Sequence, residues 1–184
     1  MNFVAIDFET AQKRRASPIQ IGVVRVIDAV IGTAQSSFVM PPQGFRDFDP
    51  ELIAIHGITP PDIQGAPEWP EILRRLDRFT TAPDGSRLPL VAHNASFERS
   101  VIRQTSAEYG LDDLGLSYLC TVKAARLLDP GSPNHKLATL AERYGIAQVS
   151  HHDAGDDARV GALLALHLLG LPGGADGMRR AELR

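Results

Sequence analysis

Apolar residues follow two different spacings along the chain, and the spacing distinguishes strands from helices. Residues 3–7, 19–27 and 29–40 are runs rich in apolar residues, many of them β-branched. Such runs are typical of strands, and the short links between them favour antiparallel pairing. The first part of the chain is therefore predicted to form a three-stranded antiparallel meander, with a tight connection at 28–30.

Farther along, apolar residues recur every three or four positions, which is typical of the buried face of a helix. A loop rich in proline and glycine covers 41–66 and contains one short helix at 50–59, and two more strands are expected at 87–93 and 116–122. The order predicts an α/β fold with a five-stranded mixed sheet, three strands antiparallel and then two parallel, flanked by helices. The other expected helices cover 68–80, 95–110, 121–128, 136–145 and 153–170.

The length and composition of the chain bound its organisation. With 184 residues, of which 43% are hydrophobic, the chain can bury one sizeable core. We expect a single domain over 1–170 and a loose tail over 171–184. The net charge of −3 gives no sign of a generally basic nucleic-acid binder, although it leaves room for a local basic groove.

The cysteine content and the hydropathy of the chain predict a cytoplasmic location. Cys120 is the one cysteine, so an internal disulfide is excluded, and its apolar neighbours favour a buried structural thiol. No apolar run reaches the roughly 18 residues of a membrane span, and the N-terminus lacks the pattern of a signal peptide.

Two carboxylates, Asp7 and Glu9, directly follow the apolar residues of the first strand. Because side chains alternate along a strand, both lie on one face of the sheet. A strand end that reaches solvent would explain one of them, whereas two adjacent like charges repel. A divalent cation between them would relieve the repulsion, and Mg²⁺ prefers such oxygen ligands. The pair alone leaves both interpretations open.

Two further clusters contain residues of the same chemistry. His93 and Asn94 lie in the turn after the fourth strand, and Glu98 follows near the start of a helix, where the helix dipole favours an anion. The second cluster, at 150–159, pairs a histidine with an aspartate five residues later.

The histidine and aspartate of that cluster can be paired in two registers, His151 with Asp156 or His152 with Asp157. Asp157 shares its helix face with small and apolar residues, whereas Asp156 shares a more polar face. We therefore predict that Asp157 points inward and that His152 lies in the loop entering the helix.

The segments "IDFETA", "VAHNASFERSVI" and "HHDAGDDA" resemble, in this order, the three motifs of the DEDDh branch of the 3′–5′ exonuclease superfamily. That branch includes the proofreading epsilon subunit of bacterial DNA polymerase III, RNase T and oligoribonuclease. The similarity covers about residues 3–170 and includes connecting segments typical of bacterial epsilon-like exonucleases. It implies a ribonuclease H-like fold and an exonuclease domain over 1–170. It also fixes the register of the third motif as His152 with Asp157.

The resemblance implies a two-metal mechanism that releases nucleoside 5′-monophosphates. Asp7 would bridge two divalent cations, Mg²⁺ or Mn²⁺, and Glu9 and Asp157 would complete the shell of the first. Glu98 would hold the second cation through water. The cations would clamp the phosphodiester and lower the pKa of a bound water, and His152 would be its general base. The family has aspartate in the second motif, so the longer Glu98 is a departure that puts full activity in doubt.

Other residues near the motifs are candidates for contact with substrate. By analogy with the family, His56 would border the terminal nucleotide and Thr10 would contact its sugar, and the histidine and asparagine of the strand turn would also touch substrate. For the two phenylalanines core packing is the better interpretation, whereas a surface-loop position for His56 and a turn position for Asn94 are equal alternatives to substrate contact. The candidate substrate-binding residues are Phe8, Thr10, His56, His93, Asn94 and Phe97.

Lys13, Arg14 and Arg15 follow the first motif. These cations either contact phosphates or lie in a solvated loop, and the sequence does not distinguish the two.

The expected partner is single-stranded nucleic acid or a 3′ end, with DNA favoured because the motifs resemble the epsilon group. An exoribonuclease of the RNase T or oligoribonuclease kind is the alternative, and a nucleic-acid-binding module with weakened catalysis is a further one. The chain lacks the long extension by which epsilon subunits bind their polymerase, so a stable polymerase complex is not expected.

Overall fold

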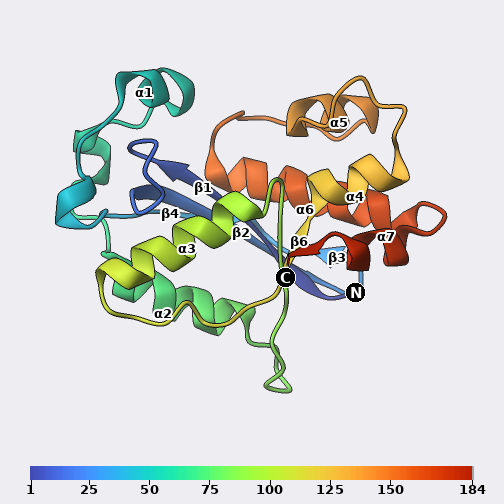
Figure 1. Cartoon of the computed structure of the whole chain (residues 1–184), viewed down its shortest axis with the longest axis horizontal. Coiled ribbons are helices and arrows are strands. Elements are labelled where there is room, and N and C mark those ends of the chain that lie inside the picture. Colours follow the sequence, from blue (N-terminus) through green and yellow to red (C-terminus); the bar gives the residue numbers. More distant parts are fainter. Residues whose placement is uncertain (184) are drawn as a thin grey trace.

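The protein, described over residues 1–183 by a computed structural model, is built on a mixed sheet with helices against both faces (Figure 1). β1 (Phe3–Thr10) lies inside the sheet and pairs antiparallel with β2 (Pro18–Ile27). On its other side β1 pairs parallel with β5 (Leu90–Ala92), which pairs parallel with β6 (Tyr118–Cys120). The predicted α/β fold with a mixed sheet is confirmed.

The sheet has seven strands in the described residues rather than the five expected, and one of the two differences lies at 29–40. This run forms two separate strands, β3 (Val30–Ile31) and β4 (Gln35–Phe38), and both pair antiparallel with β2. Val30 is β-branched but 70% exposed, so its side chain adds no burial that would hold a continuous strand together. The tight connection at 28–30 is present, with Asp28 and Ala29 both at positive φ.

The second difference is at the C-terminal end, where a loose tail was predicted and a packed helix and strand are found. α7 (Gly174–Arg180) buries Met178 completely, and β7 (Glu182–Leu183) pairs antiparallel with β6. Glycines suggested flexibility, but here they allow close packing. A Cβ added at Gly177 would lie 2.8 Å from the side chain of Leu128.

Each face of the sheet carries its own core. Val4, Ile6 and Phe8 of β1 point into a core that they share with α2 (Trp69–Thr80) and α3 (Ser96–Glu108), and this core includes the fully buried Trp69. Phe3 and Ala5 point to the opposite face, into a core shared with α4 (Thr121–Leu128), α6 (Ala154–Gly170) and α7. By the same alternation, the side chains of residues 7 and 9 continue on the α6 side of β1.

The predicted helices are found to within a few residues, and all of them except the one at 50–59 bury apolar residues. In the described part of the chain, no helix is long and apolar enough to cross a membrane. Two 3₁₀ turns, Gln43–Phe45 and Pro60–Ile63, lie in the loop before α2. The remaining helices are α1 (Pro50–His56) and α5 (Leu137–Arg143).

Candidate active site

A cleft of about 260 Å³ opens at the carboxyl ends of β1 and β5, between the start of α3 and the loop that enters α6. It brings together residues that lie up to 150 positions apart in the sequence, including every carboxylate predicted to act. Of the candidate residues, Thr10 and His56 are absent from its lining. The cleft is lined by Asp7, Phe8, Glu9, His93, Asn94, Phe97, Glu98, Leu137, His151, His152 and Asp157.

Three of these carboxylates are close enough to share one cation. Oxygen atoms of Asp7, Glu9 and Asp157 all lie within 4.8 Å of one another. An all-oxygen donor set of this kind suits a hard divalent cation such as Mg²⁺ or Mn²⁺. The residues present therefore fit the cation that the carboxylate motifs imply.

The electrostatics of the cleft agree with this fit. Burial is the main reason that the pKa of Asp7 lies well above its usual value, and the negative charge of Glu98 raises it further. Burial also raises the pKa of Glu9 to about 8, with the charges of Asp157 and Asp153 adding to the effect. Burial and neighbouring negative charge thus disfavour the ionised forms of these carboxylates, and a divalent cation between them would favour those forms.

Glu98 reaches the cleft from the first turn of α3 and is only 2% exposed. Its Oε2 atom has no hydrogen-bond partner, and burial raises its pKa to about 8 although the charge of Arg15 acts in the opposite direction. A buried polar atom without a partner is costly. A cation, or water held by one, would satisfy it.

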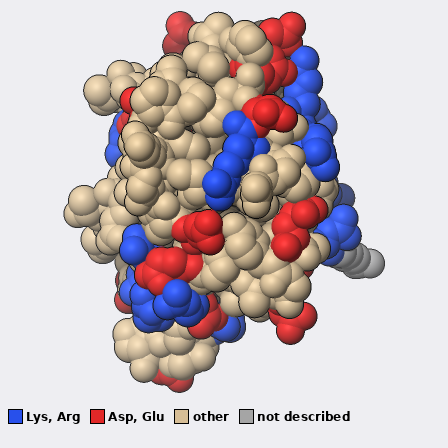
Figure 2. Space-filling model, turned by 90° about the vertical axis from the view of Figure 1, so that its left-hand side faces the viewer, with Lys and Arg blue, Asp and Glu red and all other residues tan. Residues whose placement is uncertain are grey.

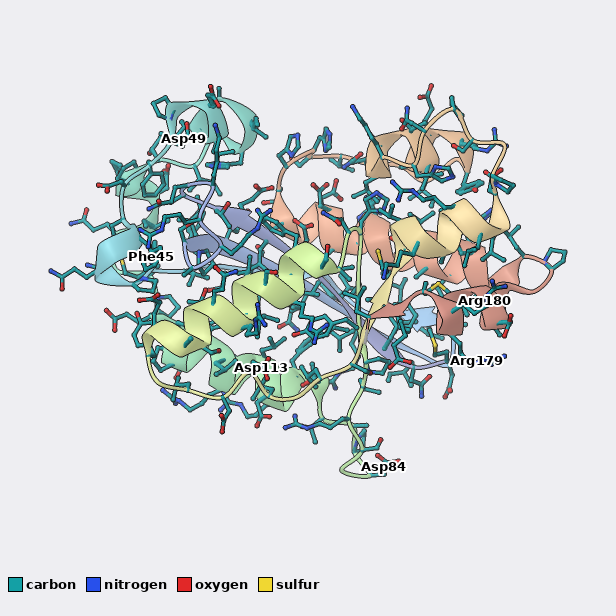
Figure 3. All side chains as sticks on the ribbon, viewed as in Figure 1. Phe45, Asp49, Asp84, Asp113, Arg179 and Arg180 are labelled. Carbon is teal, nitrogen blue, oxygen red and sulfur yellow. The ribbon has the colours of Figure 1, made fainter. Side chains whose placement is uncertain are left out.

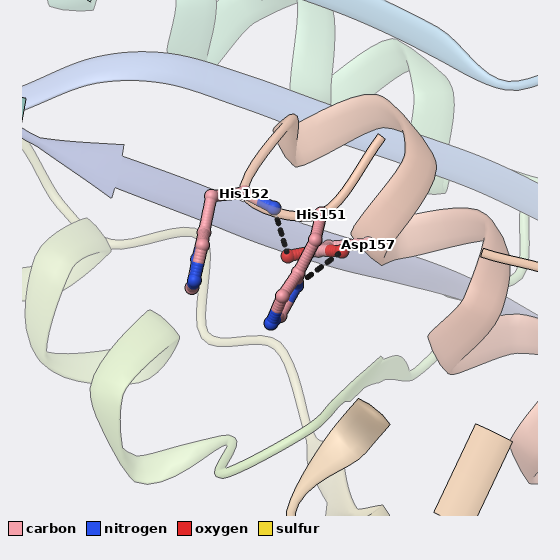
Figure 4. A group of neighbouring side chains, drawn as sticks. All are labelled: His151, His152 and Asp157. Atoms are coloured by element: carbon pink, nitrogen blue, oxygen red, sulfur yellow. Dashed lines mark hydrogen bonds and ion pairs between the residues drawn. The ribbon is translucent and has the colours of Figure 1, made fainter. Parts of the chain in front are cut away.

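Asp157, on the first turn of α6, points into the cleft and is 7% exposed. Gln148 Nε2 donates to its Oδ1 atom over 2.6 Å, and the backbone N–H of His152 donates to its Oδ2 atom over 3.3 Å (Figure 4). Asp156 instead accepts from the N–H groups of Val149 and Ser150 and pairs with a nearby arginine. The inward carboxylate is thus the one expected from the helix face.

Both histidines of the third motif, His151 and His152, lie in the cleft. The rings of His151 and His152 stack with centroids 3.9 Å apart, and His151 Nδ1 lies 3.8 Å from Asp157 Oδ1 (Figure 4). Burial lowers the pKa of His152, and the charge of His151 lowers it further. His152 has a positive φ of 64°, so the chain turns sharply where the histidine enters the site. The arrangement presents either imidazole to the carboxylates.

Gln20 helps to position Asp157, and the sequence analysis overlooked it. Gln20 Nε2 donates to Asp153 Oδ2 over 3.0 Å, and its Oε1 atom accepts from the N–H of Ala154 over 3.1 Å. These bonds tie the start of α6 to β2. The signal in the sequence was a polar residue and a glycine inside an otherwise apolar strand, "IQIGVV".

Gly22, the glycine of that strand, lies opposite Asp7 in the sheet and touches α6 directly. A Cβ at this position would lie 1.9 Å from the carbonyl oxygen of Ala154. Only glycine lets the helix that carries Asp157 approach β1 and β2 so closely.

The candidate substrate-binding residues differ in what they offer to a ligand. Phe8 is 3% exposed and packs on Trp69 with ring centroids 6.1 Å apart, which leaves little of its ring for substrate. His93 is held on both sides, with Nδ1 2.9 Å from Thr121 Oγ1 and Nε2 3.0 Å from the His135 carbonyl oxygen. Burial lowers the pKa of His93 to about 4, so its ring is neutral near pH 7.

The remaining candidates are more open or lie beside the cleft. Asn94 is exposed, with a positive φ of 74° in the turn before α3, and the ring of Phe97 is partly exposed. His56 Nδ1 accepts from the N–H of Ile58 over 3.0 Å, and its buried Nε2 atom has no hydrogen-bond partner. Burial lowers the pKa of His56, the backbone of Thr10 raises it, and the charge of His152 lowers it. These three residues are therefore neighbours.

Comparison with known proteins identifies the family. The sequence model of the RNase_T family, described as an exonuclease, matches residues 4–165. The chain belongs to this exonuclease family. The resemblance to DEDDh exonucleases is thereby confirmed, together with the ribonuclease H-like fold.

The similar sequences are much longer proteins. DNA polymerase III PolC-type from Halalkalibacterium halodurans is 30% identical over 158 residues, which is 85% of this chain and 10% of that protein. The PolC-type polymerase from Clostridium perfringens is 32% identical over 162 residues, which is 87% of this chain and 11% of that protein. The chain therefore spans about a tenth of the length of these curated relatives.

The solved structures with the same fold are nucleases. Exonuclease I matches 97% of this chain and 42% of its own, with a TM-score of 0.79 and 21% identity. Exonuclease X in complex with 5′ overhanging duplex DNA matches 97% of this chain and 98% of its own, with a TM-score of 0.70 and 24% identity. The nuclease domain of 3′hExo, a DEDDh family member bound to rAMP, matches 96% of this chain and 93% of its own, with a TM-score of 0.76 and 17% identity.

Proposed function

We propose that this protein is a metal-dependent 3′–5′ exonuclease that releases nucleoside 5′-monophosphates from nucleic acid. The observation that carries the proposal is the convergence of Asp7, Glu9, Glu98 and Asp157, from three different elements, on one cleft. Like charges brought so close serve no packing purpose, and their raised pKa values mark a site that lacks positive charge. Membership of the exonuclease family supports the same conclusion.

Each of these residues has a distinct task in the proposed reaction. Asp7, Glu9 and Asp157 would hold one divalent cation, and Glu98 would hold a second. When bound, Mg²⁺ or Mn²⁺ supplies the positive charge that the phosphodiester and its leaving oxygen need. His152 would accept the proton of the attacking water. Because its pKa is lowered, its imidazole is neutral near pH 7 and can act as a base.

The backbone of this site sets the positions of those groups. The N–H of His152 and the amide of Gln148 hold the two oxygens of Asp157, so that carboxylate has a fixed orientation. The bonds between Gln20 and the start of α6 hold the helix itself. Thr10, His56, Asn94 and Phe97 would contact the terminal nucleotide.

DNA is the substrate we propose, and RNA is the alternative. The sequence relatives are DNA polymerases, and Escherichia coli exonuclease I has been solved with an oligo-dT strand. RNA is favoured by a different neighbour, a 3′-exonuclease that recognises the histone mRNA stem-loop, which matches with a TM-score of 0.77. The cytoplasmic location and the assignment of 1–170 as the exonuclease domain stay predictions.

The test is release of mononucleotides from end-labelled DNA and RNA single strands in Mg²⁺ and in Mn²⁺. A 5′ label should appear in a ladder of shortening products, a 3′ label should appear at once as a mononucleotide, and EDTA should abolish both. Faster cleavage of DNA than of RNA would support DNA as the substrate. Binding of either strand without cleavage in either metal would contradict the proposal and favour a binding module with weakened catalysis.

A further inference from the structure

A second hollow, of about 340 Å³, lies next to the active-site cleft between the β1–β2 loop and the outer part of α3. We call it the basic groove. It is lined on the loop side by Lys13, Arg14 and Arg15, and on the other side by Phe45 and by Gln104 and Glu108 of α3. No residue of the basic groove has a task in the proposed chemistry.

The loop that carries the three cations is firmly held. The hydroxyl of Ser17, which is fully buried, donates to the carbonyl oxygen of Arg14 over 2.6 Å, and the N–H of Ala11 donates to the carbonyl oxygen of Ser17 over 2.9 Å. Lys13 forms ion pairs with Glu51 at 2.8 Å and with an aspartate at 3.6 Å, so its charge is already matched. The cations beside it are thus presented at fixed positions.

Arg14 and Arg15 have no ion pair among residues 1–183, and each places its guanidinium over an aromatic ring. The guanidinium of Arg14 is 4.0 Å from the centroid of Phe45, and that of Arg15 is 4.2 Å from the centroid of Phe97. Stacking of this kind fixes the plane of a guanidinium and leaves its N–H groups free to donate. Planar N–H donors are well suited to phosphate oxygens.

The basic groove is linked to the active-site cleft by the contact between Arg15 and Phe97. Phe97 lines the cleft and carries Arg15 on its face, and the charge of Arg15 reaches Glu98. Along α3, the ten residues from Glu98 in the cleft to Glu108 in the groove cover about 15 Å, so the two sites lie a few nucleotides apart.

We propose that the basic groove binds the phosphates of the nucleotides that precede the 3′-terminal one in a single strand. Arg14 and Arg15 are positioning residues that hold this part of the strand while the terminal nucleotide lies at the carboxylates. The chemistry recognised is the phosphodiester backbone, which DNA and RNA share. This inference rests on the proposed exonuclease function.

The surface around the basic groove has mixed charge, so binding of nucleic acid there needs a local cluster of cations. Figure 2 turns toward the viewer the side of the molecule on which Phe45 lies in Figure 3. On that face Lys and Arg side chains alternate with Asp and Glu, and no continuous basic surface is formed. Attraction of a polyanion therefore depends on the few cations that lack an acidic partner.

The test compares a dinucleotide with an octanucleotide of the same 3′ end, as DNA and as RNA, for wild type, Arg14→Gln and Arg15→Gln. For the octanucleotide, each variant should lose about tenfold in kcat/KM relative to the dinucleotide, mainly through KM, because one charge-assisted bond to a phosphate is removed. The salt dependence of octanucleotide binding should fall by about one unit of slope. Arg180→Gln, on α7 at the far side of the molecule (Figure 3), is the matched control and should keep the wild-type ratio.

An equal loss of kcat/KM for both lengths, or no loss for the octanucleotide, would overturn the proposal that the basic groove binds phosphates. A wild type that cleaves neither length would contradict the proposed function instead. In that case fluorescence anisotropy of a labelled octanucleotide still tests whether the basic groove binds the strand. Weaker binding by Arg14→Gln than by Arg180→Gln supports the groove, and equal binding overturns it.

Discussion

Glu98 is the residue at which this chain departs from the DEDDh pattern, which has aspartate there. Its side chain is one methylene longer, and the residue is only 2% exposed where it lines the cleft. One of its oxygens is also without a partner. The proposed site of a second cation is therefore where the active site of this chain departs from the family pattern.

Replacing Glu98 with aspartate should restore the family geometry. Mg²⁺ requires near-ideal octahedral coordination at short distances, so it should be the ion less tolerant of the longer carboxylate. We expect wild type to be more active in Mn²⁺ than in Mg²⁺, and Glu98→Asp to narrow this gap by raising the Mg²⁺ rate. Steady-state rates across a titration of each metal measure it. An equal fall in both metals would mean that Glu98 is already well placed.

The stacked rings of His151 and His152 raise the question of which imidazole acts as the general base. His152→Ala should lower the rate by roughly 10²–10⁴, the usual contribution of a general base, and His151→Ala should lower it much less. Because burial lowers the pKa of His152, the wild-type rate should fall only when the pH drops below the ordinary range of a histidine. Single-turnover rates of both variants across pH test the assignment, and a larger loss for His151→Ala would reverse it.

At the scale of elements, the site depends on how closely α6 packs against the sheet. Gly22→Ala would place a methyl group 1.9 Å from the carbonyl oxygen of Ala154, so the start of α6 must move. We expect a loss of roughly 1–3 kcal/mol in the free energy of unfolding, the usual cost of overpacking, together with a large loss of activity as Asp157 shifts. Urea unfolding and cleavage rates of the variant measure both effects.

Gly161→Ala is the matched control for that substitution. Gly161 lies inside the same helix, and an added Cβ would meet no atom within 4 Å. Alanine should therefore leave activity unchanged and raise the free energy of unfolding by about 0.5–1 kcal/mol, because glycine is unfavourable inside a helix. Wild-type activity and stability in Gly22→Ala would show that the contact of α6 with β2 is not needed.

The elements also show how far the sequence could predict this structure. The spacing of apolar residues located α2 correctly, because Trp69, Ile72, Leu73 and Leu76 are all buried on one face. Alternation along β1 correctly placed Asp7 and Glu9 together. The bonds of Gln20 to α6 could not be predicted, because they join residues more than 130 positions apart. The local sequence marks Gln20 as unusual within an apolar strand, but it does not say which distant residues Gln20 contacts.

At the scale of the whole molecule, the same limit explains the C-terminal end. The segment after α6 has few apolar residues and several glycines, which read as a tail, yet Met178 is completely buried and the glycines permit contact with α4 and α6. Whether a short segment packs depends on the shape of the surface that receives it. The sequence of the segment alone does not contain that shape.

The carboxylates of the cleft should also control stability of the whole fold. Glu9 and Glu98 have their pKa raised from 4.5 to about 8, so between these values the folded protein binds protons that the unfolded chain has released. The free energy of unfolding should therefore fall as pH rises through this window when metal is absent. Thermal unfolding in EDTA should show a lower Tm at pH 8 than at pH 5.5.

Added Mg²⁺ or Mn²⁺ should raise the Tm more at pH 8 than at pH 5.5, because the cation replaces the protons. Glu98→Gln cannot titrate and should flatten the pH dependence of the metal-free protein. A metal-free Tm that rises between pH 5.5 and pH 8 would contradict the raised pKa values.

The most direct test of the central claim, that the cleft holds catalytic divalent cations, is the cleavage rate of Asp7→Asn beside wild type. Asparagine keeps the size of the side chain and removes the charge at the centre of the carboxylate cluster. We expect an unchanged fold by circular dichroism and no detectable release of mononucleotides from a 3′-labelled single strand, at any concentration of Mg²⁺ or Mn²⁺. A rate comparable to wild type in matched metal would contradict the two-metal account.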